Sequence, residues 1–398
     1  MPLVNMQDLL AHARRHRYAV AAFEVADLTF LSGYMHAAEQ MRAPIVLNVP
    51  GQGRTGIGLN MVLGAVQAAV ADARVPVAVQ LDHASDLETS VNGIRHGCNG
   101  VMIDGSEMTL ADNIALTRAV VEMAHGCGLP VEGELGCIPS ADGDGEPELT
   151  SVAEARAFVE RTGVDFLAVS IGTVHGRFKG RSRIDTSRLR QINEALAIPL
   201  VIHGGTGLEE SQIQRLVANG AAKINFFTAL DEVAGKAIGG KGSYSDRLRP
   251  AIEAVATETE KYIRWCGAAG RAAEVLTQCR SSETVEHLII YNFSAEAAGR
   301  AEELLRIGRE VLGSSPGAQR VFTGRAVKEQ DRFQLCWLVR FANREVIDSY
   351  REHPAHVAFA NQHFRPYADD RISIDYQEVS DYSNPMEQHF SGRYRASA

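Results

Sequence analysis

Long hydrophobic runs are missing from this sequence, and no apolar stretch approaches the roughly 20 residues that a membrane-spanning helix needs. The first 18 residues carry charges where a secretory signal peptide would have its apolar core. The six cysteines are scattered and form no C-x-x-C pair, so a framework of structural disulfides is not indicated. These absences predict a cytoplasmic chain that makes no membrane contact.

A basic excess is also missing, because 40 lysines and arginines stand against 49 acidic residues and the net charge is −9. Binding to nucleic acid needs a clustered basic face, so the composition argues against a nucleic-acid partner. What is present is an ordinary globular composition, 45% hydrophobic and 22% charged, in 398 residues. That length suits two domains.

Short apolar runs alternate with amphipathic segments over the first 230 residues. Eight such runs occur, at residues 19–23, 44–49, 77–81, 100–103, 129–135, 166–170, 200–202 and 222–226. Strands that are apolar on both faces and separated by helices indicate a parallel sheet covered on both sides. Eight of them predict an α/β fold, a closed (β/α)8 TIM barrel. A doubly wound sheet is the alternative, but it usually has fewer strands and a glycine-rich turn after the first, where this chain has Glu24.

The pattern changes after residue 280. Strand-like alternation and helical spacing then follow in the order βαββαβ, at residues 287–293, 295–311, 320–327, 333–341, 343–352 and 371–379. This order predicts a smaller ferredoxin-like α+β domain. We therefore expect a barrel domain at 1–280, a second domain at 283–380 and a polar tail at 381–398.

Polar residues gather at the C-terminal ends of six of the predicted strands. In a TIM barrel all these ends meet on one face, which holds the active site. Three of the residues are the histidines His83, His175 and His203. Catalytic zinc takes three protein ligands and leaves a position open for substrate. Any single histidine is more simply a polar residue near a strand end, but three at equivalent ends favour a Zn²⁺ site.

A glycine-rich segment, Gly204-Gly-Thr206-Gly207, directly follows His203 and precedes a helix expected to begin near Glu209. Glycines let backbone N–H groups approach an anion, and N–H groups at a helix start bind it. TIM barrels commonly hold phosphate after strands seven and eight. Alone the segment is a plain turn, but after a candidate metal ligand it predicts a phosphate site.

Taken in order, several motifs resemble the class II fructose- and tagatose-bisphosphate aldolases over roughly residues 1–265. They are Leu-Asp-His, Glu-Leu-Gly, Ile-Gly-Thr-x-His-Gly, His-Gly-Gly-Thr-Gly and Lys-Ile-Asn-x-x-Thr. The resemblance implies a homo-oligomeric barrel, dimer or tetramer, with one zinc ion on His83, His175 and His203 and room for a monovalent cation. It implies reversible aldol cleavage of a ketose phosphate or bisphosphate, with dihydroxyacetone phosphate as the donor.

The same resemblance implies roles for individual residues. Asp82 would transfer a proton at the aldehyde oxygen, and Asp104 and Glu134 would approach the metal as a candidate second metal position. The residues implied to hold the ketose-derived part and its phosphate are Gly176, Lys179, Gly204, Thr206, Asn225 and Thr228.

The chain departs from the family pattern in three places. Glu24 stands where asparagine is usual, which adds a carboxylate near the site. In the loop after the fifth strand, Ala141 and Asp142 replace an acidic pair, and Asp142 is the best candidate for the base that removes the α-proton. Phe226 and Phe227 replace smaller or polar residues beside the substrate positions. We therefore expect the aldol reaction to be kept with a substrate other than fructose 1,6-bisphosphate.

The C-terminal segment resembles the stress-responsive dimeric α/β-barrel domains through motifs at residues 285–287, 350–359 and 370–376. In that family two copies pair sheet to sheet, so this domain is expected to promote association. A second small-molecule site that uses His287, His353 and His356 is the alternative.

Two other functions fit the barrel residues. A metal-dependent sugar-phosphate isomerase or epimerase would use similar chemistry but form no aldehyde. A non-catalytic sugar-phosphate-binding protein would keep the metal while its altered loop abolished turnover. Release of a triose or shorter aldehyde distinguishes the aldolase from both.

Overall fold

The computed structural model describes residues 2–51, 56–139, 148–177, 184–368 and 370–377. Eight parallel strands close into a barrel in chain order, which confirms the predicted TIM barrel. They are β1 (Val20–Glu24), β2 (Ile45–Pro50), β3 (Val77–Ala84), β4 (Gly100–Ile103), β5 (Val131–Leu135), β6 (Phe166–Val169), β7 (Leu200–Ile202) and β8 (Ala221–Phe226). Nearly every strand residue is buried, as runs that are apolar on both faces require.

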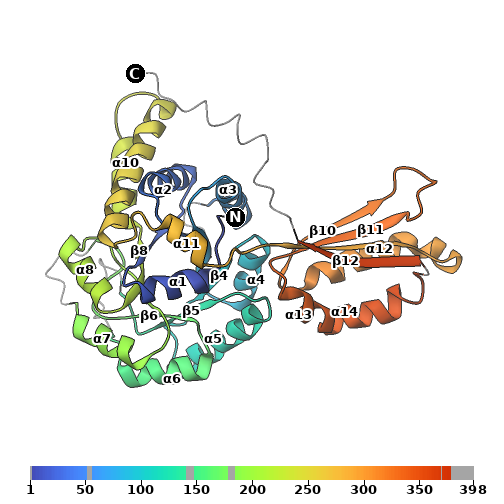
Figure 1. Ribbon diagram of the computed structural model, residues 1–398, viewed down its shortest axis with the longest axis horizontal. Coiled ribbons are helices and arrows are strands. Elements are labelled where there is room, and N and C mark those ends of the chain that lie inside the picture. Colours follow the sequence, from blue (N-terminus) through green and yellow to red (C-terminus); the bar gives the residue numbers. More distant parts are fainter. Residues whose placement is uncertain (1, 52–55, 140–147, 178–183, 369, 378–398) are drawn as a thin grey trace.

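Helices follow the strands and cover the outside of the barrel (Figure 1). They are α2 (Leu28–Met41), α3 (Leu59–Ala71), α4 (Leu87–Arg95), α5 (Leu110–His125), α6 (Val152–Thr162), α7 (Thr186–Ala195), α8 (Glu210–Ala218) and α9 (Thr228–Ile238). Several begin at a capping side chain: Asp27, Asp86 and Thr109 each accept a hydrogen bond from a backbone N–H of the first turn.

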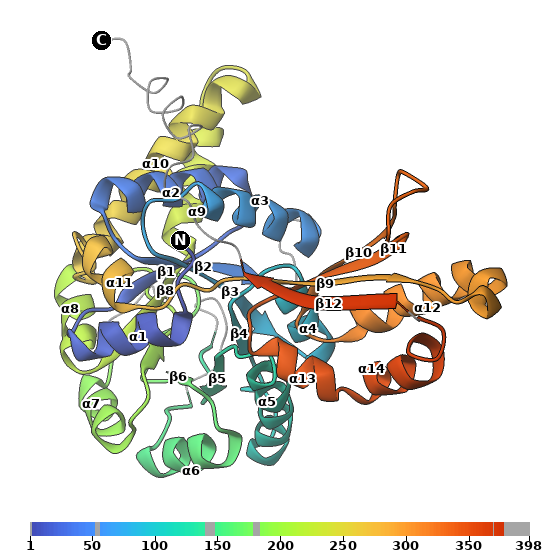
Figure 2. The same ribbon diagram turned by 45° about the vertical axis from the view of Figure 1, so that its right-hand side comes forward.

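Three further helices complete the barrel: α1 (Met6–Arg15), α10 (Tyr244–Trp265) and α11 (Ala272–Gln278). The first and last lie side by side near the starts of the strands (Figure 2). The long α10 packs on α2 and α9, and its Tyr262 stacks on Phe226 with ring centroids 4.1 Å apart. Phe226 is therefore a core residue that fixes α10 to the barrel. Among the described residues no helix is long and apolar enough to cross a membrane.

The C-terminal unit is a four-stranded antiparallel sheet in the order β10-β11-β9-β12, with helices on one face, as the ferredoxin-like prediction required. Its elements are β9 (Val285–Asn292), the 3-10 helix η1 (Ala295–Arg300), α12 (Ala301–Ser314), β10 (Ala318–Arg325), β11 (Leu335–Phe341), α13 (Val346–Glu352), α14 (Pro354–Phe359), the π-helix η2 (Ala360–Phe364) and β12 (Asp370–Gln377). The sequence pattern did not predict α14. Pro354 both ends α13 near His353 and suits the first position of the next helix.

Candidate active site

His83 enters the barrel mouth through an irregularity in β3. The pairing of β3 with β4 shifts register between Leu81 and Ala84. His83 has φ of 49°, a left-handed conformation that residues with a side chain adopt rarely. Strain of this kind persists where surrounding structure imposes it, commonly at functional sites. The irregularity lies at the adjacent residues Asp82 and His83, whose side chains would otherwise alternate between the two faces of the strand.

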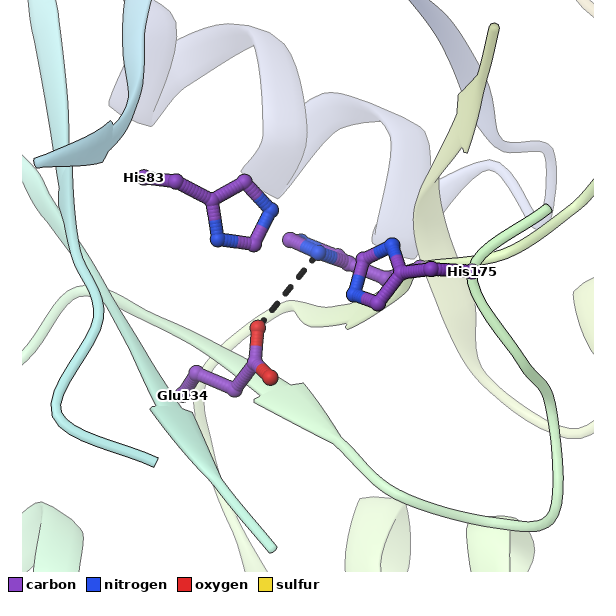
Figure 3. Close-up of side chains that lie close together, drawn as sticks. His83, Glu134 and His175 are labelled. Carbon is purple, nitrogen blue, oxygen red and sulfur yellow. Dashed lines mark ion pairs between the residues drawn. The ribbon is translucent and has the colours of Figure 1, made fainter. Parts of the chain in front are cut away.

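Four side chains converge at the C-terminal ends of the strands: His83, Glu134, His175 and His203. One potential ligand atom from each lies within 4.8 Å of the others. The three imidazole centroids are 5.0 to 5.8 Å apart. Figure 3 labels His83, Glu134 and His175, whose side chains point toward one another. Its dashed line runs from Glu134 to an unlabelled ring and marks an ion pair, and Glu134 Oε2 lies 3.4 Å from His203 Nδ1. The structure therefore brings together the three histidines that the sequence singled out.

The donor atoms inside this cluster fit a divalent cation. His203 Nδ1 and Glu134 Oε2 are buried and make no hydrogen bond to any described residue. Unsatisfied buried polar atoms are costly, and a cation between them would satisfy both. The other nitrogen of His203, Nε2, lies 2.9 Å from Glu132 Oε1, and His83 Nδ1 lies 2.7 Å from Asp104 Oδ2. Carboxylate partners on the second ring nitrogen are typical of metal-binding histidines.

The charged groups around the cluster also favour a bound cation. Burial opposes protonation of His83, but the carboxylates of Asp82, Asp104 and Glu134 outweigh it and raise the pKa of His83 to about 10. Burial, together with the neighbouring Asp104, raises the pKa of Glu134 well above its usual range. Burial lowers the pKa of His203, which favours the neutral imidazole that binds metals. A bound cation would offset the clustered negative charge.

Asp104 and Glu134, which the sequence grouped as a candidate second metal position, lie in different surroundings. Glu134 lies within the histidine cluster and can share its metal. Asp104 instead bonds His83 Nδ1 and accepts from the backbone N–H of Ser106. Through the His83 bond, Asp104 orients one ring of the histidine cluster.

A buried network beneath the cluster had no role in the sequence prediction. Lys223 is fully buried, with Nζ 2.7 Å from Glu132 Oε2, and the Gln80 amide donates to the same oxygen at 2.8 Å. Although burial opposes it, the Lys223 charge and the His203 bond lower the pKa of Glu132 to about 2. The sequence signal was available: Glu132 and Glu134 alternate in a strand, so both point into the barrel, and a lysine interrupts the apolar run of β8.

The glycine segment after β7 is shaped by a close backbone approach. Gly204 has φ of 73°, and a Cβ there would lie 2.1 Å from the carbonyl oxygen of Val174. Only glycine fits this position. Asn225 of β8 lies across from the segment, with its amide nitrogen 3.2 Å from His203 Nε2. The glycine turn and Asn225 thus lie next to the cluster of histidines and Glu134.

The helix start best suited to an anion is that of α9 rather than α8. The N-cap of α8 is Glu209, whose acidic side chain would repel phosphate. α9 begins at Thr228, and its N-cap Phe227 supplies no side-chain cap bond to the first turn. The buried Thr206 hydroxyl lies 3.4 Å from the backbone nitrogen of Ala229 in that turn. The helix expected near Glu209 is therefore present as α8, while Thr206 lies beside the start of α9, where Thr228 is the first residue.

The remaining predicted residues lie around this rim. Gly176 follows His175 with φ of 100°, and Arg177 forms an ion pair with Glu232 of α9. Glu24 is buried at the end of β1, paired in register with Asn48 of β2. The predicted Ala141, Asp142 and Lys179 lie outside the described residues.

Residues 4–271 match the family model of class II fructose-bisphosphate aldolase. The chain belongs to that family. Residues 285–378 match the stress responsive A/B barrel domain. The first match covers all six strand-end motifs of the site, and class II aldolases are metal-dependent. The site geometry and the family therefore agree on a metal-dependent aldolase rather than on an isomerase or a binding protein.

Three relatives each match about two thirds of this chain. The chain is 36% identical to a probable fructose-bisphosphate aldolase of Bacillus subtilis (strain 168) over 285 residues, which is 68% of this chain and 100% of the relative. The YdjI aldolase of Escherichia coli K12 is similar in structure, with a TM-score of 0.63, 29% identity, and 68% and 99% of the two chains covered. A putative fructose-1,6-biphosphate aldolase from Coccidioides immitis is also similar in structure, with a TM-score of 0.64 and 27% sequence identity. The match covers 69% of this chain and 100% of that chain.

The C-terminal unit contains a cavity of about 440 Å³ between its sheet and helices. His287, Tyr350 and His356 line it, and His287 Nδ1 lies 2.6 Å from Asp375 Oδ1. His353, the third histidine of the predicted second site, is the N-cap of α14 and is not among the lining residues.

Proposed function

We propose that this aldolase uses zinc to cleave a ketose phosphate or bisphosphate reversibly, with dihydroxyacetone phosphate as the common donor and product. The observation that carries this proposal is the convergence of His83, His175, His203 and Glu134 beside Asp82 and the glycine turn. The names of the relatives, which refer to fructose bisphosphate, support a phosphorylated ketose. Incubating zinc-loaded enzyme with a panel of ketose mono- and bisphosphates and measuring triose-phosphate release tests it.

Zinc is the proposed metal because imidazole nitrogens dominate the ligand set. Three histidines suit zinc, while Mg²⁺ and Ca²⁺ prefer sites built from oxygen. When bound, the metal supplies a Lewis acid for the carbonyl and neighbouring hydroxyl of the donor. Glu132 and Asp104 hold the rings of His203 and His83 from behind, so the nitrogens that face the metal are fixed in advance.

Asp82 is the proposed acid–base group. It is 4% exposed, and its buried Oδ1 makes no hydrogen bond to any described residue, so its capacity to accept a proton or a hydrogen bond is unused. In cleavage, the Asp82 carboxylate takes the proton from the hydroxyl that becomes the aldehyde, the carbon–carbon bond breaks, and its electron pair stays on the donor. Asp142 then returns a proton to the donor carbon. Condensation runs these proton transfers in reverse.

The phosphate is proposed to lie at the start of α9. Thr206, Thr228 and the backbone N–H groups of the first turn would bind its oxygens, and Asn225 would orient the adjacent carbons. Holding the phosphate away from the reacting bond uses its binding energy for orientation.

Replacing the metal ligand His203 by alanine is expected to remove the catalytic zinc and abolish aldol cleavage. Zinc content and cleavage rate are measured on the same preparation. His36→Ala, on the exposed surface of α2, is the matched control and should retain both. Full activity with an unchanged zinc content in His203→Ala would show that the cluster is not the metal site.

The phosphate proposal predicts that dihydroxyacetone phosphate binds much more tightly than dihydroxyacetone. Competition of each compound against ketose cleavage gives the two affinities. In Thr206→Val the difference between the affinities for the two compounds should become smaller. The substitution removes the hydroxyl at the start of α9 and keeps the shape of the side chain. Equal affinities of the wild-type enzyme for both compounds would mean that the segment is only a turn.

The C-terminal sheet is proposed to join two chains through its open face. Phe322, Leu338, Leu288 and Ile374 form one row across all four strands by register. Two of them are well exposed, Phe322 at 47% and Ile374 at 41%. The helices cover the opposite face, so this apolar row needs a partner, and a second copy supplies the same row.

Placing a charge in that row should weaken association. Ile374→Arg in the full-length chain is expected to shift the oligomer toward smaller species in light scattering, while zinc content and cleavage rate stay unchanged. Val327→Arg is the matched control, since Val327 is 99% exposed and lies beyond the strand. An oligomer that is the same size in both variants would refute the dimerising role.

A further inference from the structure

A second group of possible metal ligands lies far from the catalytic cluster. His12 of α1, His16 at the C-cap of α1 and Glu274 of α11 each offer one ligand atom, and these atoms lie within 4.8 Å of one another. His12 bonds Tyr18, which precedes β1, so the group sits at the starts of the strands, opposite the catalytic mouth. Figures 1 and 2 both show α1 and α11 side by side there.

The spacing of these atoms suits a zinc ion. His12 lies in α1 and His16 is its C-cap four residues later, and their rings lie side by side at the end of the helix. His12 Nε2 lies 3.6 Å and His16 Nδ1 lies 3.4 Å from the same atom, Glu274 Oε1. Zinc bonds of about 2.0–2.2 Å in a tetrahedron separate neighbouring ligand atoms by about 3.4 Å. Both contacts match that separation, although they are long for direct hydrogen bonds.

His12 gives an independent reason to expect a cation. Its side chain is fully buried, and Nε2 makes no hydrogen bond within the described part of the chain. His12 Nδ1 lies 3.0 Å from the Tyr18 hydroxyl, so Nδ1 has a hydrogen-bond partner and Nε2 is the ring nitrogen left for an ion. Nε2 faces Glu274 Oε1 at 3.6 Å, which is too far for a good hydrogen bond. A cation between these two atoms would satisfy both.

The surroundings hold Glu274 and leave His16 adjustable. Arg271 donates to Glu274 Oε2 at 3.2 Å, which leaves Oε1 for the histidines. The His16 ring stacks on His12 with centroids 4.2 Å apart and is 31% exposed, so it can turn out of the stack to aim Nδ1 at an ion. Arg15 and Arg271 add positive charge nearby, which opposes a cation, so binding would depend on the two imidazole nitrogens and the Glu274 carboxylate.

We propose that His12, His16 and Glu274 bind a second zinc ion, with water as the fourth ligand. The ion would tie the first helix of the barrel to the helix that precedes the C-terminal unit, and its role would be structural. It takes no part in the aldol reaction. Its binding is independent of the catalytic zinc.

Metal counting on the full-length chain tests this site. The chain is stripped with a chelator, reloaded with zinc and freed of excess, and zinc per chain is measured. The wild type should hold two equivalents, and His16→Ala and Glu274→Gln should each hold one while keeping the wild-type cleavage rate. His36→Ala is the control, because His36 is also paired at four residues' distance, with Gln40, and should leave two equivalents.

The His203→Ala background isolates the new site from the catalytic one. That variant should keep one equivalent, and the double variant His203→Ala/His16→Ala should hold none. Circular dichroism checks that each variant is folded, and the buried His12 is left unchanged for that reason. A His203→Ala chain without zinc, or a second equivalent that survives in both His16→Ala and Glu274→Gln, would overturn the proposal.

Discussion

Asp82→Asn is expected to lower kcat for aldol cleavage by roughly 10²–10⁴-fold, the usual contribution of a general acid–base group. Asparagine matches the shape of aspartate but cannot take or return the proton of the hydroxyl that becomes the aldehyde. The side chain is nearly buried, and its Oδ1 makes no hydrogen bond to any described residue, so water has little access to replace it. Steady-state cleavage kinetics with the preferred ketose measure the effect.

Two measurements separate proton transfer from metal binding. Zinc content should be unchanged in Asp82→Asn, because Asp82 is not part of the ligand cluster. Asp86→Asn is the matched control: it makes the same change four residues later, and asparagine still caps α4. That control should turn over at the wild-type rate. If Asp82→Asn also turns over at that rate, Asp82 has no part in the proton transfer.

Much of this architecture could be predicted from the sequence because parallel strands in a barrel are buried on both faces. Each run of apolar residues therefore marked a strand, and the polar residue after it marked the catalytic face. His83, His175 and His203 were found by this logic alone. The additional helix α14 was missed because a proline can equally end a helix or begin the next one.

Some parts of the site could not be predicted from the sequence, because they depend on where side chains point in the folded barrel. Nothing local distinguishes Glu134, which joins the histidines, from Asp104, which supports His83. The helix expected near Glu209 is present, but Thr206 turns out to contact α9. The Lys223 partner of Glu132 lies 91 residues away along the chain, so only the closed barrel brings the two together.

Lys223→Met is expected to be the most destabilising change near the site. Lys223 and Glu132 are both fully buried, and removing one partner of a buried ion pair leaves an uncompensated charge that costs about 3–5 kcal/mol. The total stability of a folded domain is only about 5–15 kcal/mol, so the urea midpoint should fall steeply. Unfolding is followed by circular dichroism without metal, so that altered zinc binding does not contribute.

The double variant Lys223→Met/Glu132→Gln identifies the cause. It removes the buried charge together with its partner, and the glutamine oxygen can still accept a hydrogen bond from His203 Nε2. Most of the lost stability should therefore return, because replacing both members of a buried pair by neutral groups is often nearly neutral. A double variant as unstable as Lys223→Met would assign the loss to packing of the lysine stem. Recovery would instead show that Lys223 compensates the buried charge of Glu132 beneath the histidine cluster.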